Sequence, residues 1–241
     1  MGNSKFFDYL LANNGPALAG FKSWLFQPGM AFNSGETWWG EKRPRSCPHE
    51  GIDLCCFEDS RGRLRQVGPD LQIPATFAGT ILKLAGDFLG KSIYLSHEIL
   101  AADGRQLCTA CGHTRPLAAL QVGQPVAAGE IIAVLAAANG EKTRVPPHLH
   151  LTMAWIPVSI DLDRLAWQNL GRDPPYFEGR NGHGREGGPS TDPRAMPSNP
   201  TTLISSRIRR PNSWAARYAP MATISLKQTR PVGRDAGSRN A

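Results

Sequence analysis

A run of short β-type segments between residues 51 and 155 is the feature that most constrains the fold of this chain. Many of the segments are β-branched or alternating, and most are bounded by glycine, proline or aspartate. They are Gly51–Phe57, Gln72–Phe77, Thr80–Leu84, Lys91–Leu95, Gln106–Ala110, Gln124–Ala127, Ile131–Leu135 and His148–Trp155. Several short strands at this spacing favour a compact all-β architecture. We therefore predict an antiparallel β-sandwich or barrel-like domain with short flanking helices.

The segments on either side of this run differ from it in composition. Residues 6–24 can hold a short amphipathic helix that is interrupted around Gly15 and Pro16, and residues 162–170 can hold a closing helix. From Gly171 onward the chain is rich in glycine, proline, serine and arginine, which is typical of disorder. We therefore predict three regions: an N-terminal helical and loop extension (1–45), a β domain (46–170) and a basic, disordered C-terminal tail (171–241).

The positive charge of the chain lies in the predicted tail. The 241 residues carry a net charge of +7, but residues 1–170 hold 15 basic and 15 acidic side chains. Because the β domain is electrically balanced, the overall charge does not indicate a domain that binds specific nucleic acids. The arginines of the tail can attract polyanions, although a solvated tail is the simpler interpretation. No apolar run approaches the roughly 18 residues of a membrane-spanning helix, so we expect no transmembrane segment.

Five of the six histidines lie between residues 49 and 150, and their spacing suits a metal ion. His148 and His150 are two residues apart, so an extended strand turns both side chains to one face. His49 and Asp53 are four residues apart and share a face in the same way. Neutral imidazole and carboxylate are good ligands for Zn²⁺, and three protein ligands plus water is the usual catalytic arrangement. We therefore predict a metal site with a further imidazole free for proton transfer.

Several motifs occur in a fixed order around these histidines. They are His49-Glu50-Gly51-Ile52-Asp53-Leu54, Ile73–Ile81, Ser92-Ile93-Tyr94-Leu95-Ser96-His97, Cys111-Gly112-His113, Val122–Ile132 and His148-Leu149-His150. In this order and spacing, the segment from about 46 to 155 resembles the lysostaphin/LytM-type zinc endopeptidases, which cleave peptide bonds in bacterial cell-wall peptidoglycan.

The resemblance implies a function and a role for each of five residues. His49, Asp53 and His150 would bind one Zn²⁺ per chain, and His113 and His148 would flank the metal-bound water and the scissile carbonyl. Either of these two imidazoles can take the proton of the water or stabilise the oxyanion, and both assignments stay open. The substrate would be the peptides of peptidoglycan, hydrolysed by a metal-activated water.

An alternative function and two locations stay open. Cys111 and the pair Leu151-Thr152 stand where the family usually has other residues, so the alternative is a non-hydrolytic peptidoglycan-binding or regulatory module of the same fold. Hydrolysis of the wall implies the cell envelope, either periplasmic or extracellular. The N-terminus does not resemble a secretory signal, because Asp8 breaks its apolar stretch, and five cysteines cannot all pair within the chain. A cytoplasmic location is therefore retained as a second expectation.

The remaining candidates each have a structural interpretation beside the functional one. Cys108 and Cys111 form a C-x-x-C motif that can hold a metal or a redox pair, but small buried strand residues are the favoured interpretation. His97 can orient a ligand or touch substrate, or be a core histidine. Glu50 follows His49 as in helical zinc peptidases, but Gly51 disfavours the helix that such a site needs.

Overall fold

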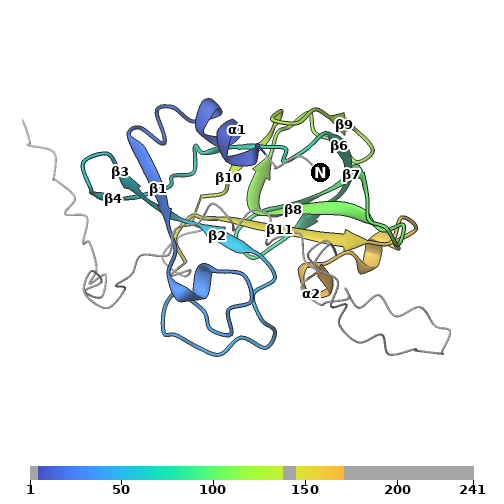
Figure 1. The fold of residues 1–241 in the computed structure, drawn as a ribbon, viewed down its shortest axis with the longest axis horizontal. Coiled ribbons are helices and arrows are strands. Elements are labelled where there is room, and N and C mark those ends of the chain that lie inside the picture. Colours follow the sequence, from blue (N-terminus) through green and yellow to red (C-terminus); the bar gives the residue numbers. More distant parts are fainter. Residues whose placement is uncertain (1–4, 138–144, 171–241) are drawn as a thin grey trace, which may run out of the picture. The chain divides into compact units, whose positions relative to one another are not determined.

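Two antiparallel β-sheets form most of the computed structural model, which describes residues 5–137 and 145–170 (Figure 1). The elements are α1 (Phe6–Asn13), β1 (Phe21–Leu25), η1 (Pro28–Met30), β2 (Ile52–Leu54), β3 (Cys56–Asp59), β4 (Leu64–Gln66), β5 (Gln72–Pro74), β6 (Gly79–Gly86), β7 (Lys91–Leu100), β8 (Gln106–Pro116), β9 (Pro125–Val126), β10 (Ile131–Leu135), β11 (Leu149–Ile156), η2 (Leu162–Arg164) and α2 (Trp167–Leu170). The smaller sheet has the order β1-β3-β4. The larger has the order β2-β11-β8-β7-β6-β9, and β10 pairs with β8 and β5.

This arrangement confirms the prediction of an all-β, antiparallel fold with short flanking helices. Most of the strands predicted at the centre of the sequence are present, and β7 and β8 extend several residues further than predicted. The predicted strand Gly51–Phe57 is divided into β2 of the larger sheet and β3 of the smaller sheet, and β4 was not predicted. The tail predicted at 171–241 lies outside the described residues. Within the described ranges, no helix has the length and apolar character that crossing a membrane requires.

The prediction for residues 6–24 was wrong in its second half. Helix α1 ends at Asn13, and the segment Phe21–Leu25 is strand β1, which pairs with β3. The buried side chain of Asn14 ends the helix, because its amide bonds the backbone of Leu10 on one side and of Gln72 on the other. Residues 162–170 likewise form two short helices, η2 and α2, instead of one.

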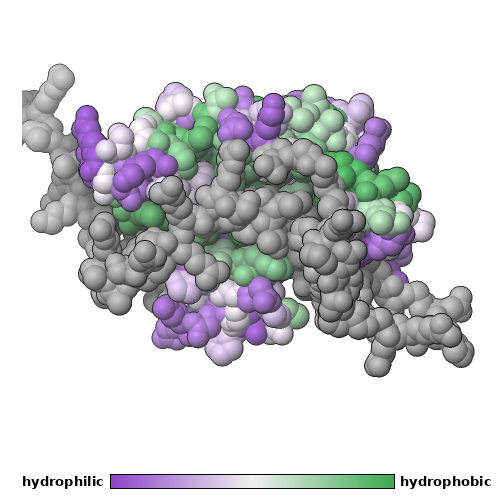
Figure 2. All heavy atoms as spheres, in the orientation of Figure 1, coloured by the Kyte–Doolittle hydropathy of each residue, from purple (hydrophilic) through white to green (hydrophobic). Residues whose placement is uncertain are grey.

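The long loop between η1 and β2 is the least regular described part of the fold. An isolated bridge joins Glu36 to Pro44, and backbone hydrogen bonds join Asn33 and Ser34 to His49. Figure 2 shows mostly hydrophilic residues on the outer surface of this loop. Its Trp38 side chain is nevertheless buried, which brings an indole from the loop toward the sheet.

All five cysteines are free, and Cys108 and Cys111 are buried residues of β8. Burial raises the pKa of both thiols to about 12. The thiols are therefore protonated at neutral pH, which agrees with the favoured interpretation of buried strand residues.

His97 of β7 belongs to a buried hydrogen-bond network in the core. Its Nδ1 donates to the carbonyl oxygen of Ala78 over 3.0 Å, and its Nε2 lies 2.8 Å from Thr109 Oγ1 and 3.3 Å from Thr76 Oγ1. The two threonine oxygens are 2.8 Å apart. Because every ring nitrogen has a partner in the core, the interpretation of His97 as a core histidine is the one that its contacts support.

This network predicts a pH dependence of stability. Burial lowers the pKa of His97 to about 4, below the ordinary value of about 6.5 that it regains on unfolding. Between these two values the unfolded chain binds one more proton than the folded one, so stability falls as the pH is lowered from about 6.5 to about 4. We expect His97→Gln, which keeps a donor and an acceptor, to remove about 3 kcal/mol of this loss. Urea denaturation of both proteins at several pH values measures it, and parallel curves would contradict it.

Candidate metal centre

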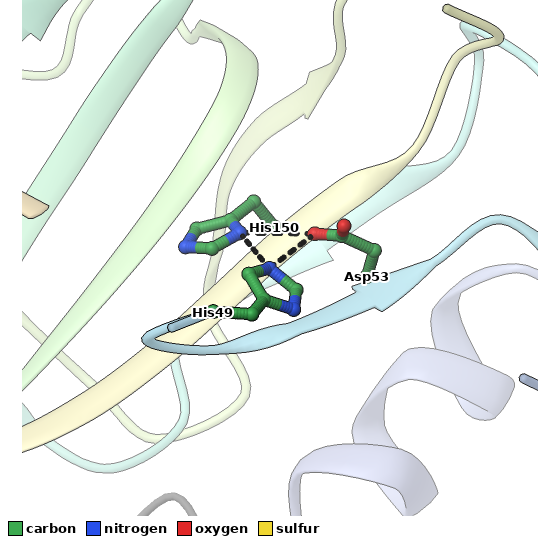
Figure 3. Close-up of side chains that lie close together, drawn as sticks. All are labelled: His49, Asp53 and His150. Atoms are coloured by element: carbon green, nitrogen blue, oxygen red, sulfur yellow. Dashed lines mark hydrogen bonds and ion pairs between the residues drawn. The ribbon is translucent and has the colours of Figure 1, made fainter. Parts of the chain in front are cut away.

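Strand pairing brings Asp53 and His150 together. Strands β2 and β11 are antiparallel, and their register sets the Cα of Asp53 directly opposite that of His150. All eight residues of β11 are buried, because alternate side chains of this strand face apolar layers or the site. The side chains of Asp53 and His150, from β2 and β11, point toward one another in Figure 3.

His49 reaches the same point from the segment just before β2. Its backbone is held by the hydrogen bonds to the η1–β2 loop, and Gly51 then allows the chain to pass close to β11. A Cβ on Gly51 would lie 2.5 Å from the carbonyl oxygen of Leu151 and 3.0 Å from Cε1 of His150. Only glycine, which has no side chain, fits at this position. The placement of His49 next to β11 therefore depends on glycine at residue 51.

One side-chain atom from each of the three predicted ligand residues lies within 3.3 Å of the other two. His150 Nδ1 is 2.9 Å from Asp53 Oδ1, His49 Nε2 is 3.3 Å from the same oxygen, and the two nitrogens are 3.1 Å apart (Figure 3). Donor atoms placed about 2.0–2.1 Å from a tetrahedral zinc ion stand about 3.3 Å apart. Buried lone pairs this close repel one another unless a proton or a cation lies between them. The spacing therefore suits a metal ion.

Each imidazole has a partner on the side away from the cluster. His49 Nδ1 lies 3.1 Å from the carbonyl oxygen of Ala31, which can only accept, so a neutral His49 keeps its lone pair on Nε2. His150 Nε2 lies 2.8 Å from Thr152 Oγ1. This hydroxyl oxygen can accept a hydrogen bond from a protonated Nε2, which leaves the lone pair of Nδ1 for a metal. Such outer partners orient metal ligands and fix their tautomers.

The carboxylate of Asp53 is held in the same way through its second oxygen. Trp38 Nε1 donates to Asp53 Oδ2 over 2.6 Å, and Arg45 Nη2 is 3.9 Å from that oxygen. The Arg45 guanidinium also lies 5.1 Å from the centre of the Trp39 ring. With Oδ2 occupied by these donors, Oδ1 is the oxygen that faces the two imidazoles.

The charges of the cluster suit a cation. Burial opposes ionisation of Asp53, but the rings of His49 and His148 and hydrogen bonds from His150 and His49 outweigh it and hold the pKa of Asp53 well below its ordinary value. Burial lowers the pKa of His148 to about 4 and also lowers that of His150, although Asp53 acts in the opposite direction. Asp53 is therefore held as a carboxylate, and burial favours the neutral form of His150; these are the forms that bind metals.

His113 and His148 lie beside this cluster, with ring centres 4.5 Å apart. His148 directly precedes β11. Its Nδ1 donates to the Pro146 carbonyl oxygen over 2.9 Å, and its Nε2 is 3.9 Å from Asp53 Oδ1. His113 lies on β8 with Nδ1 3.1 Å from Asp87 Oδ1. The structure thus brings all five predicted site residues into one region, with two imidazoles outside the group of three.

Aromatic side chains surround the two flanking histidines. The ring of Trp167 lies 4.6 Å from that of His150 and 5.0 Å from that of His113. Further ring contacts are Trp38–His148 at 5.1 Å, Trp39–His148 at 6.3 Å and Phe88–His113 at 4.5 Å. The imidazoles among these rings are buried, and burial strengthens the electrostatic interactions among them.

Sequence reasoning missed the residues that orient the five. Trp38 and Asp87 come from loops, 15 residues from Asp53 and 26 residues from His113 respectively, and no local spacing connects them to their partners. The contact of Thr152 could have been predicted, because Thr152 lies two residues after His150 on a strand and therefore shares its face.

Comparison with known proteins finds the same peptidase group that the motifs resemble. No family model and no curated protein matches the chain. Lysostaphin from Staphylococcus simulans matches with 19% identity over 56% of this chain and 49% of its own, at a TM-score of 0.34. The catalytic domain of a mutant of the prophage-encoded M23 protein EnpA from Enterococcus faecalis matches with 21% identity over 56% of this chain and 87% of its own, at a TM-score of 0.32. A zinc-containing peptidase from Vibrio cholerae matches with 19% identity over 56% of this chain and 36% of its own, also at 0.32.

The chain spans less than half the length of the lysostaphin chains that it matches.

The hydrogen bond from Trp38 predicts a loss of metal affinity on its removal. Trp38→Phe keeps an aromatic ring but takes the donor from Asp53 Oδ2. Because losing an outer partner of a ligand typically weakens metal binding 10–100-fold, we expect a loss of about that size. Competition for Zn²⁺ against a chromogenic chelator measures it.

Trp39→Phe is the matched control, since Trp39 is the next residue and also contacts His148, whereas the indole that bonds Asp53 is that of Trp38. Its affinity should stay close to that of the parent. Equal affinities for Trp38→Phe and Trp39→Phe would show that the indole hydrogen bond does not orient the carboxylate.

Proposed function

We propose that this chain is a zinc-dependent endopeptidase that hydrolyses peptide bonds of bacterial cell-wall peptidoglycan. The observation that carries the proposal is the convergence of His49 Nε2, Asp53 Oδ1 and His150 Nδ1 within 2.9–3.3 Å, beside two further imidazoles. A purely structural cluster would not need the two flanking histidines.

The donor set favours zinc in a catalytic site. Two imidazoles and one carboxylate form a three-ligand set of the catalytic kind, whereas structural zinc sites are usually closed by four ligands, often with cysteine. The cysteines Cys108 and Cys111 are protonated and buried, and they do not belong to the group of three. A zinc ion held by His49, Asp53 and His150 would lower the pKa of a bound water to about 7 and polarise a carbonyl oxygen.

The two flanking imidazoles supply proton transfer and charge stabilisation. In their neutral forms His113 and His148 each have Nδ1 directed at an acceptor, Asp87 and Pro146 respectively, so each keeps its lone pair on Nε2. One of them accepts the proton of the attacking water, and the other, when protonated, donates to the developing oxyanion. General-base catalysis of this kind contributes about 10²–10⁴-fold to the rate.

The substrate class rests on the sequence motifs and on the aromatic surface beside the histidines. Trp39 and Phe88 have rings 6.5 Å apart, and Phe88 is 52% exposed although it contacts His113. The exposed Phe88 ring, with the half-buried Trp39 ring beside it, is suited to packing against a peptide backbone or an apolar side chain. We place the protein in the cell envelope, periplasmic or extracellular, because its proposed substrate lies there.

Zinc analysis combined with a wall-hydrolysis assay tests this function. We expect the parent to bind one zinc ion per chain and to release soluble peptides from insoluble peptidoglycan in a chelator-sensitive way. His150→Ala removes a ligand, so it should lose both zinc and activity. His113→Ala should keep the zinc and lose about 10²–10⁴-fold in kcat.

The mass of the released fragments separates cleavage of peptide bonds from cleavage of the glycan. A parent that binds the wall and zinc but releases nothing would replace the proposal with the non-hydrolytic module of the same fold. A parent without stoichiometric zinc would contradict the metal site itself.

A further inference from the structure

Asp87 lies in the hairpin turn between β6 and β7 and closes that turn with its carboxylate. Its Oδ1 accepts from the backbone N–H of Leu89 over 2.9 Å and of Gly90 over 2.7 Å. Its Oδ2 accepts from Ser92 Oγ over 2.9 Å. These bonds are those of an Asx turn, which fixes the carboxylate relative to the sheet.

The same two oxygens also hold His113 on the neighbouring part of β8. Asp87 Oδ2 accepts from the backbone N–H of His113 over 2.9 Å, and Asp87 Oδ1 lies 3.1 Å from His113 Nδ1. Both side chains are almost fully buried, with 3% of the His113 side chain and 7% of the Asp87 side chain exposed. Burial opposes ionisation of Asp87, but the hydrogen bonds from His113 outweigh it and hold the pKa of Asp87 below its ordinary value.

The backbone of His113 is in an unusual conformation. Its φ is +61°, in the left-handed region that costs a non-glycine residue about 1–2 kcal/mol. The two peptide groups of His113 are held by Asp87 Oδ2 at the N–H and by the N–H of Ala136 at the carbonyl, over 2.9 and 2.8 Å. Asp87 therefore contributes to the strained conformation that aims the ring, as well as contacting the ring itself.

We propose that Asp87 is a positioning residue that fixes the orientation and the tautomer of His113. Because an ionised carboxylate can only accept, His113 carries its proton on Nδ1 and presents the Nε2 lone pair on the other side of the ring. His148 has a neutral carbonyl in the corresponding place, whereas the carboxylate of Asp87 stabilises the imidazolium that forms when His113 takes a proton. The catalytic consequence rests on the proposed peptidase function and assigns the base to His113.

The ring nitrogens of His113 provide a test that needs no substrate. In full-length protein labelled with ¹⁵N-histidine, we expect the Nδ1 of His113 to have the shift of a protonated nitrogen and Nε2 that of an unprotonated one. Asp87→Asn should move both shifts toward the values of exchanging tautomers, because one side of the amide is a donor. Asp87→Ser keeps a hydroxyl for the turn without reaching the ring, and should do the same. A His113→Gln spectrum assigns the signals.

The kinetic readout separates positioning from a structural effect. Asp87→Asn should lower kcat on peptidoglycan by at least about 100-fold with KM within about threefold, as expected for loss of an interaction made in the transition state. Asp103→Asn is the matched control, since Asp103 also closes a hairpin turn, between β7 and β8, but its carboxylate accepts from Arg105 N and Nε and not from a histidine. Its shifts and kcat should equal those of the parent.

The outcomes distinguish this proposal from the proposed function. Asp87 variants that keep the parent's ring shifts, or that change the shifts without lowering kcat in an active parent, would overturn the positioning role. A parent that hydrolyses nothing overturns the peptidase function, and the ring shifts then still decide whether Asp87 fixes the tautomer.

Discussion

The antiparallel pairing of β2 with β11 is the interaction on which the candidate site depends. It sets Asp53 opposite His150, and the close passage at Gly51 then brings His49 to the same point. Because side chains alternate along a strand, a slip of one residue would turn Asp53 away from both imidazoles. The positions of the three donor residues are therefore set by the backbone pairing of the strands, and their side-chain contacts then orient the donor atoms.

A second layer of polar contacts decides which atoms face inward. Ala31, Trp38 and Thr152 each bond the outer side of one member of the group, so that Nε2 of His49, Oδ1 of Asp53 and Nδ1 of His150 remain for a cation. Two of these three partners come from the long loop before β2. This irregular loop thus contributes to a site that is otherwise built on strands, and the buried indole of Trp38 attaches the loop to the site.

Much of this could be predicted from the sequence where the signal is local. The alternation of His148, Leu149 and His150 predicted a shared face, and the short strands predicted the all-β fold. The second half of the helix expected over residues 6–24 was wrong because Phe21–Leu25 pairs as a strand with β3, which lies further along the chain. Trp38 and Asp87 were missed for the same reason: their roles come from contacts that only the folded chain creates.

The wide separation of the ligands along the chain has a thermodynamic consequence. Asp53 and His150 are 97 residues apart, and they meet only when the larger sheet has formed. An ion shared between them would be bound by the folded chain and not by the unfolded one, so its binding free energy would add to the stability of the fold. Occupancy would therefore be coupled to cooperative unfolding of the whole sheet, and depletion of the ion would lower the melting temperature of strands far from it.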